Sequence, residues 1–210
     1  MLKKSQERIL STNSFECPQA SSNLRIKDTQ EFLYKTITTL KTNRMDYHIC
    51  QSLYLYRIKF IMDKNKKKKN ERKSTIFDWN YLYNEDIEQI FTRILKLFEV
   101  DGQIIILSLF LLEKFIYKSR IILDENNYTK LIIVSLMETI KFFVDDSSID
   151  AKLICSVLKI DKEMLVNMEY TFLNSINYKL NIDEEKFFLY KQKIMIIWVD
   201  YLKNKLWKKV

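Results

Sequence analysis

Hydrophobic residues recur at helical spacing in the second half of the chain. Asn84 is a suitable N-cap with acidic residues after it, and the apolar positions that follow are Ile87, Ile90, Phe91, Ile94, Leu95 and Phe98. A second helix is predicted after Asp101, and its body, residues 104–116, is apolar on nearly every side. Because a helix without a polar face must be buried all round, we expect this one at the centre of the fold.

The same spacing predicts further helices towards the C-terminus. We expect them at about 128–144, 149–158, from Asp161 to Ile176, and 183–208. The polar residues 145–148 can end the third helix and cap the fourth, and residues 178–182 form an extended stretch. Five helices, of which the second and third are almost entirely apolar, indicate one compact all-α domain.

The first part of the chain has a weaker pattern. Residues 1–28 are polar, and we interpret them as a disordered arm. Residues 29–62 are rich in aromatic and β-branched residues, which favours one or two helices but leaves a strand possible. Residues 63–76 are expected to form a basic linker. The predicted organisation then continues with a helical domain at 77–182 and a C-terminal helix at 183–210.

The composition excludes several classes of function. The 210 residues include one glycine, one proline, one histidine and three cysteines. A phosphate-binding loop needs several glycines, and a zinc or disulfide framework needs more closely spaced cysteines. No nucleophile is paired with a histidine in the sequence. We therefore expect no enzyme activity, cofactor, metal or small-molecule substrate, and a reducing compartment, cytoplasmic or nuclear.

The positive charge lies in the flanks of the chain. The net charge is +8, yet residues 74–202 contain twenty acidic and fourteen basic residues, a net charge of −6. An acidic domain is a poor phosphate-binding surface, so direct binding of nucleic acid is not expected. The lysine run at 64–73 is interpreted as a solvated loop or, alternatively, as a nuclear-import signal or polyanion tether. The longest apolar run, 104–112, has about half the roughly 20 residues of a membrane helix, so no membrane association is expected.

Two pairs of charged residues lie in apolar surroundings. Lys141 is close to the end of the third predicted helix, and Glu169 lies within the apolar stripe of the fifth. Solitary charges are costly to desolvate, so these two are expected to pair, either inside the domain or as a charged hub that meets a partner. Arg93 and Glu113, on the first and second helices, are interpreted as a structural ion pair between those helices.

The order and spacing of several short motifs resemble a single cyclin box of the P/U (phosphate-pathway) type, over about residues 77–182. Arg93-Ile94 is similar to the Arg-Ile of that subfamily, and Glu113-Lys114 stands where the family has Asp-Arg. Lys141 and Asp146 fall at family positions near the end of the third helix. Residues 169–173, Glu-Tyr-Thr-Phe-Leu, followed by Ile176-Asn-Tyr-Lys-Leu180, look like the most specific family motif.

The resemblance implies a non-enzymatic regulatory subunit that binds and activates a cyclin-dependent protein kinase as a heterodimer. It also implies that Lys141 and Glu169 form the hub that grips the kinase's αC-helix region, and that Phe142, Tyr178 and Leu180 pack apolar groups beside it. Two other classes of function stay open. One is a helical scaffold or adaptor whose partner is not a kinase, and the other is a cyclin-fold transcription factor.

Overall fold

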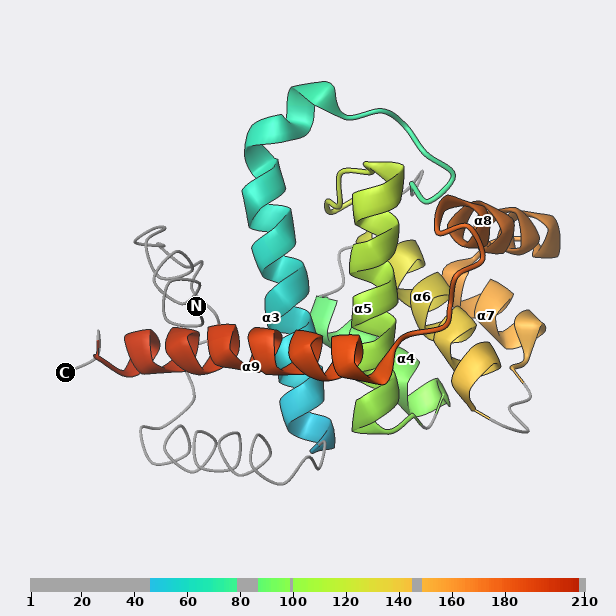
Figure 1. Ribbon diagram of the computed structural model, residues 1–210. Helices are drawn as coiled ribbons and strands as arrows, with labels where there is room; N and C mark the ends of the chain where they lie inside the picture. The colour runs from blue at the N-terminus through green and yellow to red at the C-terminus, as the bar shows by residue number, and fades with distance from the viewer. Residues whose placement is uncertain (1–45, 79–86, 99, 145–148, 208–210) are drawn as a thin grey trace.

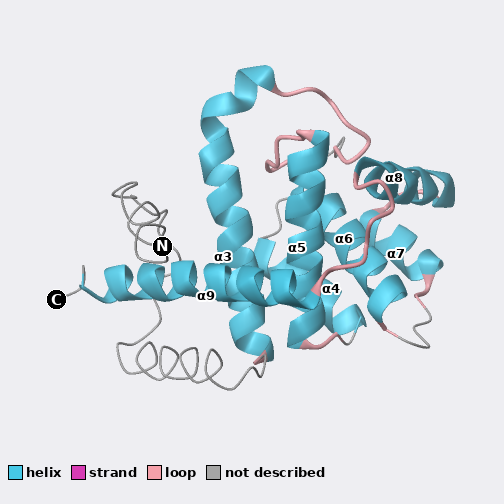
Figure 2. Ribbon diagram, in the orientation of Figure 1, coloured by secondary structure: helices cyan, strands magenta, loops and turns pink. Residues whose placement is uncertain are grey.

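The computed structural model describes residues 46–78, 87–98, 100–144 and 149–207 (Figure 1). These residues form an all-α structure, as the sequence predicts, and no strand occurs among them (Figure 2). The elements in chain order are α3 (Tyr47–Asn65), the 3₁₀ helix η1 (Lys66–Glu71), α4 (Ile87–Phe98), α5 (Gly102–Ser119), α6 (Tyr128–Phe143), α7 (Ala151–Leu158), α8 (Lys162–Ser175) and α9 (Glu184–Trp207).

Helices α5 and α6 form the centre of the fold. Every residue of α6 from Tyr128 to Ile140 is buried, and α5 is buried from Ile104 to Leu109. The central position expected for the second predicted helix is therefore confirmed, and α6 shares it. The small residues Ser108 and Ser135 lie where the two helices meet, and the Ser135 hydroxyl donates a 2.5 Å hydrogen bond to the Ser108 carbonyl. A buried hydroxyl is thus satisfied across the interface.

Aspartate side chains cap the N-terminal ends of α3, α5, α7 and α8. The Asp101 carboxylate accepts a hydrogen bond from the Ile104 amide at 2.8 Å, and Asp161 caps α8 in the same way through Met164 at 2.6 Å. Both starts agree with the sequence prediction. The start of α7, the fourth predicted helix, differs from the prediction, because its cap is Asp150, which accepts a hydrogen bond from the Lys152 amide. The predicted caps Asn84 and 145–148 lie outside the described residues.

The aromatic segment before the lysine run is helical. Residues 47–65 form the single helix α3, which packs along α5, and the ring of Tyr54 stacks on Phe91 of α4 with centroids 4.5 Å apart. The strand alternative for this segment is therefore wrong. The arm at 1–28 and residues 29–45 lie outside the described part of the chain.

The expected basic linker is more ordered than a solvated loop. Residues 63–65 belong to α3, and the following six residues form η1. Arg72 then forms ion pairs with Asp78 and with Asp124 of the α5–α6 connection. These contacts fasten the segment after η1 to the centre of the fold. The side chains of Lys66, Lys67 and Lys68 remain exposed.

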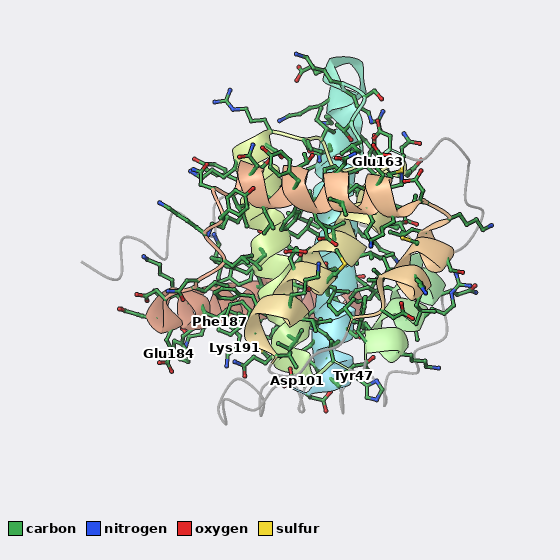
Figure 3. All side chains as sticks on the ribbon, turned by 90° about the vertical axis from the view of Figure 1, so that its right-hand side faces the viewer. Tyr47, Asp101, Glu163, Glu184, Phe187 and Lys191 are labelled. Carbon is green, nitrogen blue, oxygen red and sulfur yellow. The ribbon has the colours of Figure 1, made fainter. Side chains whose placement is uncertain are left out.

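The C-terminal helix α9 crosses the outer side of α3 and α5 (Figure 1). Its first turns carry Glu184, Phe187 and Lys191 to the end of the molecule where Tyr47 and Asp101 mark the starts of α3 and α5 (Figure 3). Further along, Trp198 and Tyr201 stack on each other. Both rings also contact Tyr56 of α3, with centroids 4.9 and 4.5 Å away. Aromatic packing therefore holds α9 against α3.

None of the described helices combines the length and the apolar character that crossing a membrane requires.

Candidate functional site: a charged triad on α6 and α8

Lys141 and Glu169 meet at the surface between α6 and α8. Lys141 belongs to the last turn of α6, Glu169 lies in the middle of α8, and the Lys141 Nζ is 2.9 Å from the Glu169 Oε2. The two helices pack against each other, which brings together residues that are remote in the sequence. The ammonium side chain is 39% exposed and the carboxylate side chain 22%. The expected pairing is therefore present at a half-exposed position, where an approaching molecule can reach both groups.

Glu138 is the third member of this triad, and the sequence analysis missed it. Its Oε1 lies 3.2 Å from the Lys141 Nζ, and its side chain is only 5% exposed. Burial raises the pKa of the Glu138 carboxyl, the positive charge of Lys141 lowers it, and the negative charge of Glu169 raises it again, with a net upward shift. The signal that could have identified Glu138 is its position three residues before Lys141, on the same helix face.

Exposed apolar side chains lie beside the triad in the chain. Phe142, directly after Lys141, is 50% exposed, and its ring packs edge-on against Phe143 at 4.9 Å. Tyr170 follows Glu169, and Val166 lies one turn before it on α8; both are exposed. Large apolar side chains left in water next to a half-exposed ion pair are typical of a docking surface.

The other two residues of the expected hub lie in the turn after α8. Tyr178 is 57% exposed and Leu180 packs partly against the core. Within the described residues, the Tyr178 side chain forms no hydrogen bond with the triad. The backbone of Asn177 and Tyr178 is left-handed, with φ of 56° and 54°, and the Tyr178 amide donates to the Leu173 carbonyl at 2.8 Å. A bulky residue in this region is strained, so the turn holds Tyr178 outward at a cost.

The expected pairing of Arg93 with Glu113 is wrong. Both Glu113 carboxylate oxygens accept hydrogen bonds from Arg57 of α3, at 2.7 and 3.0 Å, and Oε1 also accepts from the Tyr190 hydroxyl of α9 at 3.0 Å. The Arg93 side chain is exposed on α4. Glu113 faces α3 and α9, because those helices cover its side of α5. Glu113 still links helices through a charged side chain, but it links α5 to α3 and α9 and not to α4.

The pKa shifts of this second cluster show how its charges are stabilised. Burial lowers the pKa of the Arg57 guanidinium, but the hydrogen bonds and negative charge of Glu113 outweigh burial and raise it overall. Burial and the charge of Glu113 raise the pKa of Tyr190 well above its ordinary value. At neutral pH Arg57 is therefore charged and Tyr190 is neutral, and both side chains hydrogen-bond to Glu113.

Helix α3 carries a buried cysteine and an exposed histidine. The Cys50 thiol is buried, and burial together with Asp46 and Asp101 raises its pKa to about 12, so it stays protonated. His48 is exposed, and its ring packs edge-on against Tyr47. Across the described part of the chain, histidine, cysteine and acidic residues form no group of three that could hold a metal ion.

No known family model matches the chain, and no curated protein is detectably similar to it.

Proposed function

We propose that the chain is a cyclin-like regulatory subunit that binds and activates a cyclin-dependent protein kinase. The observation that carries the proposal is the 2.9 Å contact between Lys141 and Glu169, made across two helices at a surface with exposed apolar neighbours. The order of α4 to α8, with α5 and α6 in the centre, also agrees with the five-helix box that the sequence motifs resemble.

The chemistry of the triad supports a docking role. An ammonium group has three donors, and in Lys141 one points at Glu138 and another at Glu169. The exposed side of the triad can therefore still donate to carbonyl oxygens of a partner and accept from its amides. A partner that covers Phe142 and Tyr170 would also exclude water from the ion pair, which strengthens each polar contact.

Such docking would act on the kinase through the position of one helix. Phosphoryl transfer requires the Lys–Glu ion pair of the kinase and its metal-binding Asp to be in place, and the position of αC controls both. In this proposal the chain supplies no reacting group. Its contribution is the difference in binding free energy between the active and the inactive position of αC.

Co-purification and a kinase assay with paired variants test the proposal. We expect Lys141→Ala or Glu169→Ala to abolish kinase association and to leave the chain helical, because truncating one member of a desolvated charge pair costs about 2–5 kcal/mol of binding free energy. The matched control is the exposed pair of Lys59 with Glu88, at 2.8 Å, whose alanine variants should still associate. Retained kinase binding in both Lys141 and Glu169 variants would refute the docking surface.

A charge swap separates docking from a purely structural ion pair. In the double variant Lys141→Glu with Glu169→Lys, the triad still contains one ammonium and two carboxylates, so the fold keeps its attraction. Fixed groups on a kinase would now face the wrong charges, and we expect binding to stay lost. If the swap restored kinase association, the pair would be structural only. Recovery of a kinase without raised activity would favour a subunit that binds the kinase without activating it.

A further inference from the structure

Three lysines gather on the outer side of α5 near its C-terminal end. Lys114 and Lys118 lie one helical turn apart, and Lys179 belongs to the turn that follows α8. The Lys114 Nζ donates a 2.5 Å hydrogen bond to the Lys179 carbonyl oxygen, which joins the two segments. We call Lys114, Lys118 and Lys179 the basic cluster. The Lys118 and Lys179 side chains are exposed, and so is Tyr117 between the two α5 lysines, which is 79% exposed.

The charges of the basic cluster are not compensated within the described structure. Burial lowers the pKa of Lys114, and the positive charges of Lys179 and Lys118 lower it further. Of the carboxylates in the described ranges, none forms an ion pair with a lysine of the cluster. Other surface lysines do form ion pairs with carboxylates, such as Lys59 with Glu88 and Lys66 with Asp63. An external anion at the cluster would relieve a repulsion that the fold leaves in place.

The spacing of the cluster fits an extended peptide. Lys114 and Lys118 are about 6 Å apart along the helix axis. Alternate side chains of an extended chain lie on one face at a separation of about 6.5–7 Å. Acidic residues at every second position of a peptide laid along α5 would therefore each meet one lysine. Nucleic acid is less suitable, because the cluster covers little more than one helical turn and residues 74–202 carry a net charge of −6.

We propose that the basic cluster binds an extended acidic segment of a protein partner, with Asp or Glu at alternate positions. The proposal stands apart from kinase docking at the Lys141–Glu169 pair, because it rests on other side chains and concerns another ligand chemistry. Tyr178, which belongs to the surface proposed for kinase docking, lies directly before Lys179 in the chain.

Fluorescence anisotropy with the full chain tests the proposal. The probe is a labelled peptide with Glu at every second position, and its matched control has Gln at those positions. We expect saturable binding of the Glu peptide alone, weakened by salt. The triple variant Lys114→Gln, Lys118→Gln, Lys179→Gln should bind about tenfold more weakly, since three ion pairs with the peptide are lost. A second triple variant, Lys96→Gln, Lys152→Gln, Lys162→Gln, removes the same charge from other exposed positions and should bind like the wild type.

Several outcomes would overturn the assignment. Equal losses in the two triple variants would mean that the peptide responds only to net charge. Equal binding of the Gln peptide would remove the role of the acidic residues. Tighter binding of single-stranded RNA than of the Glu peptide, lost in the cluster variant alone, would assign the surface to nucleic acid instead. The Lys141→Ala variant should bind the Glu peptide normally, so failure of kinase docking and failure of this proposal are distinguishable.

Discussion

The Tyr190 hydroxyl donates a 3.0 Å hydrogen bond to Oε1 of Glu113, although 77 residues separate the two in the chain. The same carboxylate is held by Arg57. Three helices that are distant in the sequence, α3, α5 and α9, are therefore joined at one partly buried acidic side chain.

Removing the Tyr190 hydroxyl should destabilise the fold. In Tyr190→Phe the Glu113 carboxylate loses one donor, and we expect the free energy of unfolding to fall by about 1.5–3 kcal/mol, the usual range for a hydrogen bond to a charged group. Urea denaturation measures the change. Tyr117→Phe is the control, because that side chain is 79% exposed and its change should stay within about 0.5 kcal/mol. Equal effects of the two substitutions would contradict the role of the Tyr190 hydroxyl.

A double-mutant cycle should identify the partner of Glu113. We expect Arg57→Ala and Glu113→Ala to be coupled by more than about 1 kcal/mol, because the two side chains share two hydrogen bonds. The cycle of Arg93→Ala with Glu113→Ala should be additive within about 0.5 kcal/mol. Unfolding free energies of the single and double variants give both coupling energies. Coupling confined to the Arg93 cycle would speak against the observed junction.

The raised pKa of Glu138 predicts a particular pH dependence of stability. A carboxyl whose pKa is higher in the folded state binds more protons there than in the unfolded chain. Its contribution therefore favours the fold at low pH and is lost as pH rises from its ordinary value of 4.5 through the raised pKa. Glutamine does not titrate, so this loss is absent in Glu138→Gln. We expect the free energy of unfolding of the variant to rise relative to that of the wild type as pH increases. Denaturation at a series of pH values tests the sign, and a pH-independent difference would contradict it.

Glycine at the end of α5 should stabilise the fold. Arg120 is the C-cap of α5 and has φ of 57°, and its amide donates to the Ile116 carbonyl. A left-handed conformation costs a residue with a Cβ about 1 kcal/mol that glycine does not pay. We expect Arg120→Gly to raise the free energy of unfolding by about 0.5–1 kcal/mol. Arg120→Ala removes the same charge but keeps the Cβ, so it should give no such gain; equal gains would refute the backbone explanation.

Local signals in the sequence were sufficient for most helices. Asp101 and Asp161 are caps because a short acidic side chain precedes an apolar run, and that relation needs no tertiary information. The buried position of α5 follows from its lack of a polar face. The pairing of Lys141 with Glu169 was expected because each charge was isolated among apolar neighbours, and the structure brings them together.

Contacts between helices that are distant in the chain are harder to predict from the sequence. The sequence favours Arg93 as the partner of Glu113, because both lie among Ile and Leu residues. The observed partner depends instead on which face of α5 is covered by α3 and α9. Helical periodicity places a residue on a face of its own helix but does not say which helix covers that face. The same limit explains why the basic cluster, which joins α5 to the turn after α8, was not anticipated.

The junction at Glu113 also bears on how the protein can be divided. A fragment trimmed to residues 77–182 would lack both Arg57 and Tyr190, and the carboxylate would be left without the two side chains that satisfy it. The same fragment would also expose to solvent the faces of α5 that α3 and α9 cover. The shortest fragment that folds on its own should therefore begin at Asp46, which caps α3, and include the turns of α9 that carry Trp198 and Tyr201. Binding assays on residues 77–182 alone would measure a destabilised fragment.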